Sequence, residues 1–89
     1  MKRLEARVFG SVQGIGFRAF VKKKAENCFL KGFVQNKPDG SVEIVAEGLE
    51  RDLTHFLDAI SKGPFLPQIR GFETKMTTPT NLFVGFEIR

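Results

Sequence analysis

The sequence predicts an α+β domain with one sheet and two helices, and three patterns support this fold class. Several short segments alternate apolar with polar residues, which is typical of half-buried strands. Two longer segments repeat their apolar residues every three or four positions, as amphipathic helices do. A turn motif, Lys37-Pro38-Asp39-Gly40, separates two of the alternating segments and indicates a hairpin. The predicted order is β-α-β-β-α-β with a short extra strand at the end.

The first strand and the first helix are predicted from a change in the spacing of apolar residues. Residues 3–12 alternate, with one apolar face made of Leu4, Ala6, Val8, Gly10 and Val12. A loop containing Gly14 and Gly16 comes next. From Phe17 onward the spacing becomes three, four and seven, which predicts a helix with apolar positions Phe17, Phe20, Val21, Ala25 and Cys28. Its solvated side is expected to carry Lys22, Lys23, Lys24 and Glu26, with Asn27 near its end.

The middle of the chain predicts a hairpin and then a second helix. Strands are expected over Phe29–Asn36 and Ser41–Glu47. Proline presets the first central angle of the turn between them and Gly40 accepts a positive φ, so the two strands are antiparallel. Gly48 is expected to end the third strand, and Leu49–Lys62 has the apolar spacing of an amphipathic helix. Gly63-Pro64 ends that helix.

The last third of the chain completes the sheet. A loop through Pro67 leads to a fourth strand over residues 68–76, and a polar turn over residues 77–81 leads to a final strand over 83–89. Phe86 and Ile88 are spaced for one buried face of that strand. Right-handed crossovers make the first strand parallel to the second. The result is the ferredoxin-like split βαβ arrangement, an antiparallel-rich α/β sandwich with both helices on one face, formed by residues 1–89 as a single domain.

The amino-acid composition limits the kinds of ligand, cofactor and partner that we expect. Hydrophobic residues make up 42% and charged residues 27%, which argues against disorder. The net charge of +4 favours anionic partners, and nucleic acid, anionic lipid and phosphorylated metabolites all fit it. One cysteine, Cys28, and one histidine, His55, leave no disulfide and no zinc constellation, so no cofactor is expected. Without a membrane-length apolar run or a signal peptide, we expect a soluble, cytoplasmic protein with no membrane partner.

The loop between the first strand and the first helix is the strongest functional signal. Glycines let the backbone of residues 14–16 turn sharply and approach a ligand closely. The backbone N–H groups at a helix start point toward one place, and the helix dipole adds partial positive charge there. Arg18 adds a full charge in the first turn. A phosphate is the expected ligand. The alternative is a plain strand-to-helix turn with a solvated Arg18.

A dinucleotide-binding fingerprint competes for the same residues. The segment from Gly14 to Ala19 fits G-x-G-x-x-A after a strand. The chain is too short for a doubly wound sheet, however, and the hairpin at residues 37–40 imposes an antiparallel pair where a third parallel strand is required. Asp39 has roughly the offset of a ribose partner but is better explained as a turn residue.

Asn36 is the second candidate site residue. It ends the second strand, and the carboxyl ends of parallel strands meet at one sheet edge, about 10 Å apart when one strand lies between them. Asn cannot act as a base but can hold a water molecule; the alternative is an ordinary turn-entry Asn. His55 is expected on the surface and Cys28 in the core. A site of Arg, Asn and backbone donors suits a leaving group that departs unprotonated, as in an acyl phosphate.

Two long motifs run from Gly10 to Arg18 and from Gly32 to Glu43, and two shorter ones are Gly63-Pro64 and the segment Phe86–Arg89. In these motifs the sequence resembles the acylphosphatase family. The resemblance implies a ferredoxin-like fold and metal-free hydrolysis of the carboxyl–phosphate bond to a carboxylate and inorganic phosphate. It implies that Arg18 binds the phosphate, that Asn36 orients the attacking water, and that backbone N–H groups come from Gln13, Gly14, Ile15, Gly16, Phe17 and Arg18. Departures are Ile15 for Val, Phe33 for Trp, and no aromatic residue after Ile88-Arg89.

Further expectations concern partners. We expect a small acyl phosphate as substrate, inorganic phosphate or sulfate as a product-like ligand, no specific nucleic acid, and a monomer. A second hypothesis is a non-catalytic phosphate- or RNA-binding module that uses the same loop or the open sheet face. Phe9 and Phe33 are placed on that face by the alternation and could stack on bases.

Overall fold

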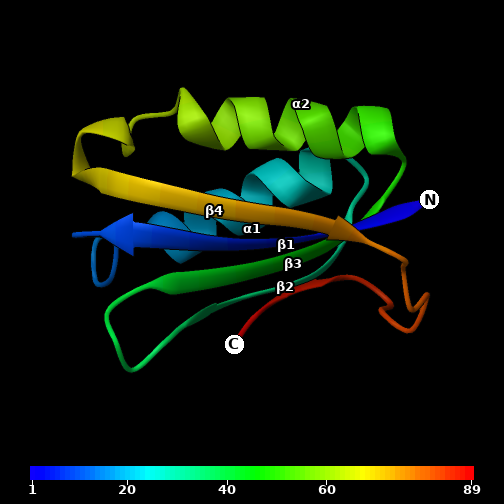
Figure 1. Ribbon diagram of the computed structural model, residues 1–89, viewed down its shortest axis with the longest axis horizontal. Coiled ribbons are helices and arrows are strands. Elements are labelled where there is room, and N and C mark those ends of the chain that lie inside the picture. The colour runs from blue at the N-terminus through cyan, green and yellow to red at the C-terminus, as the bar shows by residue number, and fades with distance from the viewer.

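A computed structural model describes residues 1–89 as a five-stranded sheet with two helices (Figure 1). The elements are β1 (Lys2–Gly10), α1 (Phe17–Asn27), β2 (Lys31–Asn36), β3 (Val42–Gly48), α2 (Glu50–Ser61), a short 3-10 helix (Leu66–Gln68), β4 (Ile69–Thr77) and β5 (Phe86–Ile88). The strand order across the sheet is β4-β1-β3-β2-β5. The predicted ferredoxin-like fold and its extra strand are confirmed.

The sheet topology brings the two predicted site segments to one edge. β3 pairs antiparallel with both β1 and β2, so β1 and β2 are parallel and two strand spacings apart. The loop after β1 and the turn after β2 therefore lie at the same end of the sheet, at the left of Figure 1. β5 is the exception to the antiparallel pattern, because it pairs parallel with β2. Its pairing carries the end of the chain toward the same edge.

The core lies between the sheet and the helices. Alternate residues of β1 are fully buried, as predicted, and so are the apolar positions of both helices that face the sheet. The largest fully buried side chains of the core are Phe17, Phe56, Leu4, Ile44, Leu53 and Ile60. Burying an aliphatic or aromatic side chain of this size contributes about 1.5–3 kcal/mol. Phe17 is the first residue of α1, so its anchoring in the core fixes where the helix starts.

Several predicted strand ends differ from the structure, and the backbone explains the differences at the end of β1 and at the start of β2. β1 ends at Gly10 instead of Val12, because the pairing with β4 shifts there and the backbone passes so close to Gln68 that a Cβ would lie 2.1 Å from its carbonyl oxygen. β2 begins at Lys31 instead of Phe29, because Phe29 has a φ of 61° and completes the turn that ends α1. Gly48 is the last residue of β3 rather than the residue after it.

The final strand is shorter than predicted, and only one of its two apolar side chains is buried. Residues 83–85 are irregular, so β5 spans Phe86–Ile88. Phe86 is buried against Phe56, with ring centroids 6.4 Å apart, whereas Ile88 is 43% exposed. The prediction that both side chains are buried is therefore wrong for Ile88. It lies at the edge of the sheet that carries the β1–α1 loop and lines a pocket there.

The open face of the sheet is partly covered by the segment between β4 and β5. Phe83 packs on Phe33 with ring centroids 5.9 Å apart, and the guanidinium of Arg89 lies 4.0 Å from the centre of the Phe33 ring. Phe33 is consequently buried. This arrangement contradicts the expectation that Phe33 is available to stack on RNA bases from the open face.

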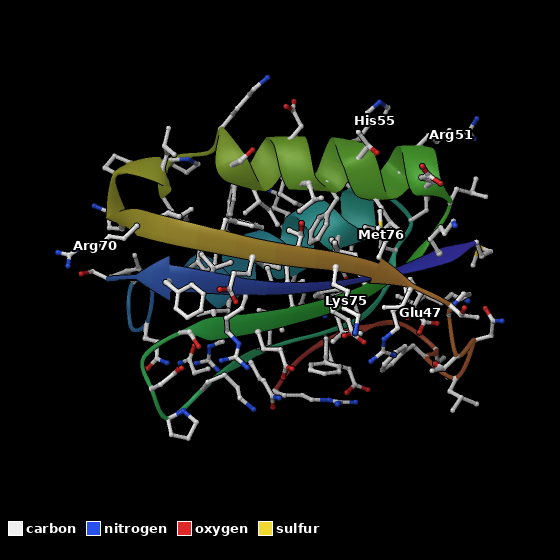
Figure 2. The ribbon with its side chains drawn as sticks, in the orientation of Figure 1. Glu47, Arg51, His55, Arg70, Lys75 and Met76 are labelled. Carbon is white, nitrogen blue, oxygen red and sulfur yellow. The ribbon has the colours of Figure 1, made fainter.

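One buried carboxylate holds that segment to the sheet. Glu47 of β3 accepts hydrogen bonds from the backbone N–H groups of Thr80 and Asn81, both at 2.9 Å, and from Thr80 Oγ1 at 3.0 Å. Arg3 of β1 adds a contact of 3.1 Å. Figure 2 shows Glu47 at the end of the sheet where this segment leaves β4. Burial alone raises the pKa of Glu47, but the four donated hydrogen bonds outweigh it, and the pKa is lowered.

Glu47→Gln is expected to destabilise the fold by about 2–4 kcal/mol, because Arg3 loses its buried partner and one amide oxygen replaces two carboxylate oxygens. A lowered folded-state pKa also means that Glu47 stabilises the fold fully above its unfolded pKa of about 4.3 and loses this contribution as the pH falls through the folded value. Denaturant unfolding at pH 7 and at acid pH measures both effects. The exposed partner of Arg3 gives the control, since Glu5→Gln should cost less than about 1 kcal/mol.

Candidate functional site

The loop between β1 and α1 has the backbone shape that the sequence predicts. Gly14 and Gly16 have φ values of 77° and 88°, in the left-handed region, and Gly16 caps α1. A Cβ at either position would meet no atom within 4 Å, so glycine is favoured there by backbone conformation and not by lack of space. The loop is solvent-exposed from Gly14 to Gly16.

The loop presents a row of unpaired backbone donors. No protein group accepts a hydrogen bond from the N–H groups of residues 12–19, and the first to be paired is that of Phe20, which donates to the Gly16 carbonyl at 3.2 Å. The first turn of α1 contains no acidic residue. Free N–H groups and the positive end of a helix dipole form a favourable site for an anion.

A pocket of about 170 Å³ opens at this loop. Its lining combines apolar side chains, loop glycines and one cation: Val12, Gly14, Gly16, Phe17, Arg18, Ala19 and Ile88. Of the six residues predicted to hold a phosphate, Ile15 and Gln13 are absent from this lining. A groove of about 320 Å³ on the open face is larger, but three carboxylates (Glu5, Glu43 and Glu73) against two cations make it unfavourable for a phosphate.

Arg18 is oriented by the last residue of the sequence. Its Nη1 donates to the backbone oxygen of Arg89 at 2.9 Å. The Arg89 N–H in turn donates to the Val34 carbonyl at 2.8 Å, which ties the end of the chain to β2. The remaining N–H groups of the Arg18 fork stay available for a planar pair of anion oxygens. The contact with Arg89 joins residues 71 positions apart and was not predicted, because nothing in the local pattern marks a backbone oxygen as a partner.

Asn36 lies at the end of β2, on the face of the sheet that the helices cover. Side chains alternate along a strand, so Asn36 shares its face with Val34, which is fully buried. Its Oδ1 is buried and makes no hydrogen bond with any protein group. A buried amide oxygen without a partner is costly and points to a ligand or water at that position. Asn36 does not itself line the pocket around Arg18.

The turn after Asn36 is rigidly held. Asp39 Oδ1 accepts hydrogen bonds from Ser41 Oγ at 2.6 Å and from the Ser41 backbone N–H at 2.9 Å, and these bonds lower the pKa of Asp39. Arg7 of β1 reaches Ser41 Oγ at 3.2 Å and Asp39 at 3.4 Å. The interpretation of Asp39 as a turn residue is therefore confirmed.

Gln13 joins the loop to this turn through its side chain. Its Nε2 donates to the carbonyl of Lys37 at 2.8 Å and to that of Ser41 at 2.9 Å. The sequence predicted only a backbone role for Gln13. The partners lie 24 and 28 positions away, so only the folded sheet reveals them.

The remaining candidates lie outside this site. His55 is exposed and points away from the sheet on the outer side of α2 in Figure 2, as predicted. Cys28 caps α1 and is only partly buried, and burial followed by the charge of Asp52 raises its thiol pKa. No group of three or more His, Cys, Asp or Glu side chains is arranged to hold a metal ion. None of the helices has the length and apolar character needed to span a membrane.

The fold and the loop together define a small ferredoxin-like domain with a row of unpaired backbone N–H groups at the start of its first helix. The family model described as Acylphosphatase matches residues 4–88, nearly the whole chain. The chain belongs to the acylphosphatase family and is an enzyme of that family.

Individual relatives agree with this assignment over their full length. A protein named acylphosphatase from Thermus thermophilus is 47% identical over 88 residues, which cover 99% of either chain. One from Archaeoglobus fulgidus is 44% identical, covering 99% of this chain and 98% of the relative. The crystal structure of acylphosphatase from Bacillus subtilis superposes with a TM-score of 0.92 at 35% identity, covering 100% of this chain and 99% of that one.

Proposed function

We propose that this enzyme hydrolyses small acyl phosphates to a carboxylate and inorganic phosphate without a metal ion, with Arg18 binding the phosphoryl group and Asn36 positioning the attacking water. One observation carries the proposal. The unpaired N–H groups of the β1–α1 loop meet Arg18 at the same sheet edge where the buried Oδ1 of Asn36 lacks a protein partner. Family membership supports the reaction class.

The reaction needs positioning and charge more than proton transfer. The loop N–H groups and the Arg18 fork would hold the phosphoryl oxygens and neutralise their charge. The oxygen of the water held by Asn36 forms the new bond to phosphorus, and the bond from phosphorus to the acyl oxygen breaks. That electron pair leaves on the carboxylate, and the proton of the water passes to a phosphate oxygen or to solvent.

The absence of an acid beside the pocket favours an acyl phosphate over a phosphomonoester. A carboxylate leaves without a proton at neutral pH, since carboxyl groups have pKa values near 4. An alkoxide leaving group requires protonation, and neither Arg18 nor Asn36 can supply a proton. The acidic residues nearest in sequence to the two site residues, Glu26 and Asp39, are engaged with Lys22 and with the hairpin turn.

Acetyl phosphate tests the proposal directly. Purified protein is expected to release inorganic phosphate from acetyl phosphate at an undiminished rate with EDTA present. The rate should vary less than about threefold between pH 5.5 and 8, because the proposed mechanism requires no side chain to gain or lose a proton. A chelator-sensitive rate would contradict the metal-free mechanism.

His55→Ala is the matched control for the pH profile. It should leave the rate and its pH dependence unchanged, because His55 lies on the outer side of α2. A bell-shaped profile with a pKa near 6.5 that disappears in His55→Ala would overturn the proposed mechanism. Tight, steeply salt-dependent binding of RNA without turnover of acetyl phosphate would instead favour a nucleic-acid-binding module.

A further inference from the structure

We propose that the side chain of Gln13 is a positioning residue, which holds Asn36 at a fixed distance from the phosphate-binding loop. The inference rests on the proposed function and names a residue that neither contacts the phosphate nor holds the water through its side chain. The Nε2 group donates both of its hydrogens to the hairpin, to Lys37 O at 2.8 Å and Ser41 O at 2.9 Å. These are the only hydrogen bonds that join residues 11–19 to the hairpin turn.

The choice of acceptor makes the contact relevant to Asn36. Lys37 follows Asn36 directly, so fixing the Lys37 carbonyl fixes the backbone that carries the Asn36 side chain. Gln13 for its part precedes Gly14, the first glycine of the loop. One side-chain amide thus connects the two halves of the proposed site, which belong to segments more than 20 residues apart.

The hairpin turn does not need Gln13 in order to form. The Lys37 N–H donates to Ser41 O at 2.8 Å, and the Gly40 N–H donates to Lys37 O at 3.1 Å, so each carbonyl keeps a backbone partner without Gln13. Asp39 and Arg7 hold the turn further through Ser41. What Gln13 adds is a direct hydrogen-bonded link between the loop and the hairpin. Attack on a bound phosphoryl group depends steeply on the distance between the two, and a displacement of about 1 Å can cost a hundredfold in rate.

Gln13→Met tests this role, because methionine has a similar length and no donor. We expect kcat for acetyl phosphate to fall about tenfold or more, while the inhibition constant of inorganic phosphate changes less than about threefold. Gln35→Met is the matched control. Gln35 spans the same hairpin with one bond of 2.6 Å to Glu43, on the opposite face of the sheet. It should lower Tm by a similar few degrees and leave kcat unchanged.

A double variant separates positioning from a general loss of structure. In an Asn36→Ala background, Gln13→Met should lower kcat by less than about twofold more, because the position of a missing side chain no longer matters. An equal factor in both backgrounds would overturn the positioning role, as would a wild-type kcat in Gln13→Met. Near-wild-type turnover by Asn36→Ala alone would overturn the water-holding proposal itself, so the two failures are distinguishable.

A second variant covers the case in which Gln13→Met does not fold. Gln13→Glu keeps the shape of the side chain but places carboxylate oxygens against the two carbonyl oxygens, which repel it. As for Gln13→Met, we expect a lower kcat for acetyl phosphate and little change in the inhibition constant of inorganic phosphate. An unchanged kcat in a folded Gln13→Glu protein would contradict the inference as strongly as the first variant.

Discussion

Arg18→Ala is expected to lower kcat/KM for acetyl phosphate by about a thousandfold or more, which is the effect of removing an arginine that stabilises charge on a transferred phosphoryl group. Both kcat and KM should change. Arg18 is the only cation among the pocket residues, so KM and the inhibition constant of inorganic phosphate should rise together with the fall in kcat. Phosphate release and inhibition by phosphate measure the two effects in one assay.

Arg18→Lys and Arg51→Ala make the Arg18 result interpretable. Lysine keeps the charge but loses the two-pronged donor geometry and the contact with the Arg89 oxygen, so an intermediate loss is expected. Arg51 is an exposed cation on the first turn of α2, and its removal should leave turnover unchanged. Activity within about threefold of wild type in Arg18→Ala would show that the loop N–H groups bind the phosphate alone and would reject the proposed role.

The parts of this molecule that sequence patterns predicted are those set by local periodicity or by a contiguous motif. The alternation in β1 identified Leu4, Ala6 and Val8 as buried, because a strand repeats every two residues whatever its neighbours. The loop conformation followed from Gly14 and Gly16, whose positive φ values are a local property. The position of Asn36 near the loop could also be predicted from the sequence, because a hairpin and a right-handed crossover determine which strand ends lie at the same edge of the sheet.

The contacts that complete the site were not predictable in the same way. The Arg18–Arg89 and Gln13–Lys37 bonds end on backbone oxygens, which every residue possesses, so no residue type signals them. Glu47 is the last residue of the predicted strand Ser41–Glu47, but its burial depends on an irregular segment of eight residues folding over it. Ile88 lies on the expected face and is nevertheless exposed, since it lines the pocket at the start of α1 instead of packing into the core.

Asn36→Ala is expected to lower kcat by about a hundredfold to a thousandfold, which is the usual cost of removing one polar group that acts on the transition state. The inhibition constant of inorganic phosphate should change less than about threefold, because the loop and Arg18 are untouched. Asn27→Ala is the control, since Asn27 is an exposed asparagine at the end of α1. Turnover near the wild-type level in Asn36→Ala would reject the water-positioning role.

Stability gives an independent test of why asparagine stands at position 36. The Oδ1 atom is buried without a protein partner, so removing it relieves a desolvation cost instead of breaking a hydrogen bond. Asn36→Ala should therefore unfold at the same or a higher denaturant concentration than wild type, even as its turnover collapses. A residue that costs stability and supports turnover is explained by catalysis, because a purely structural asparagine would destabilise the fold when it is removed. Asn36→Ala could instead be markedly destabilised and lose turnover only in proportion to its unfolded fraction. That result would give Asn36 a structural role in the hairpin and would reject its role in positioning the attacking water.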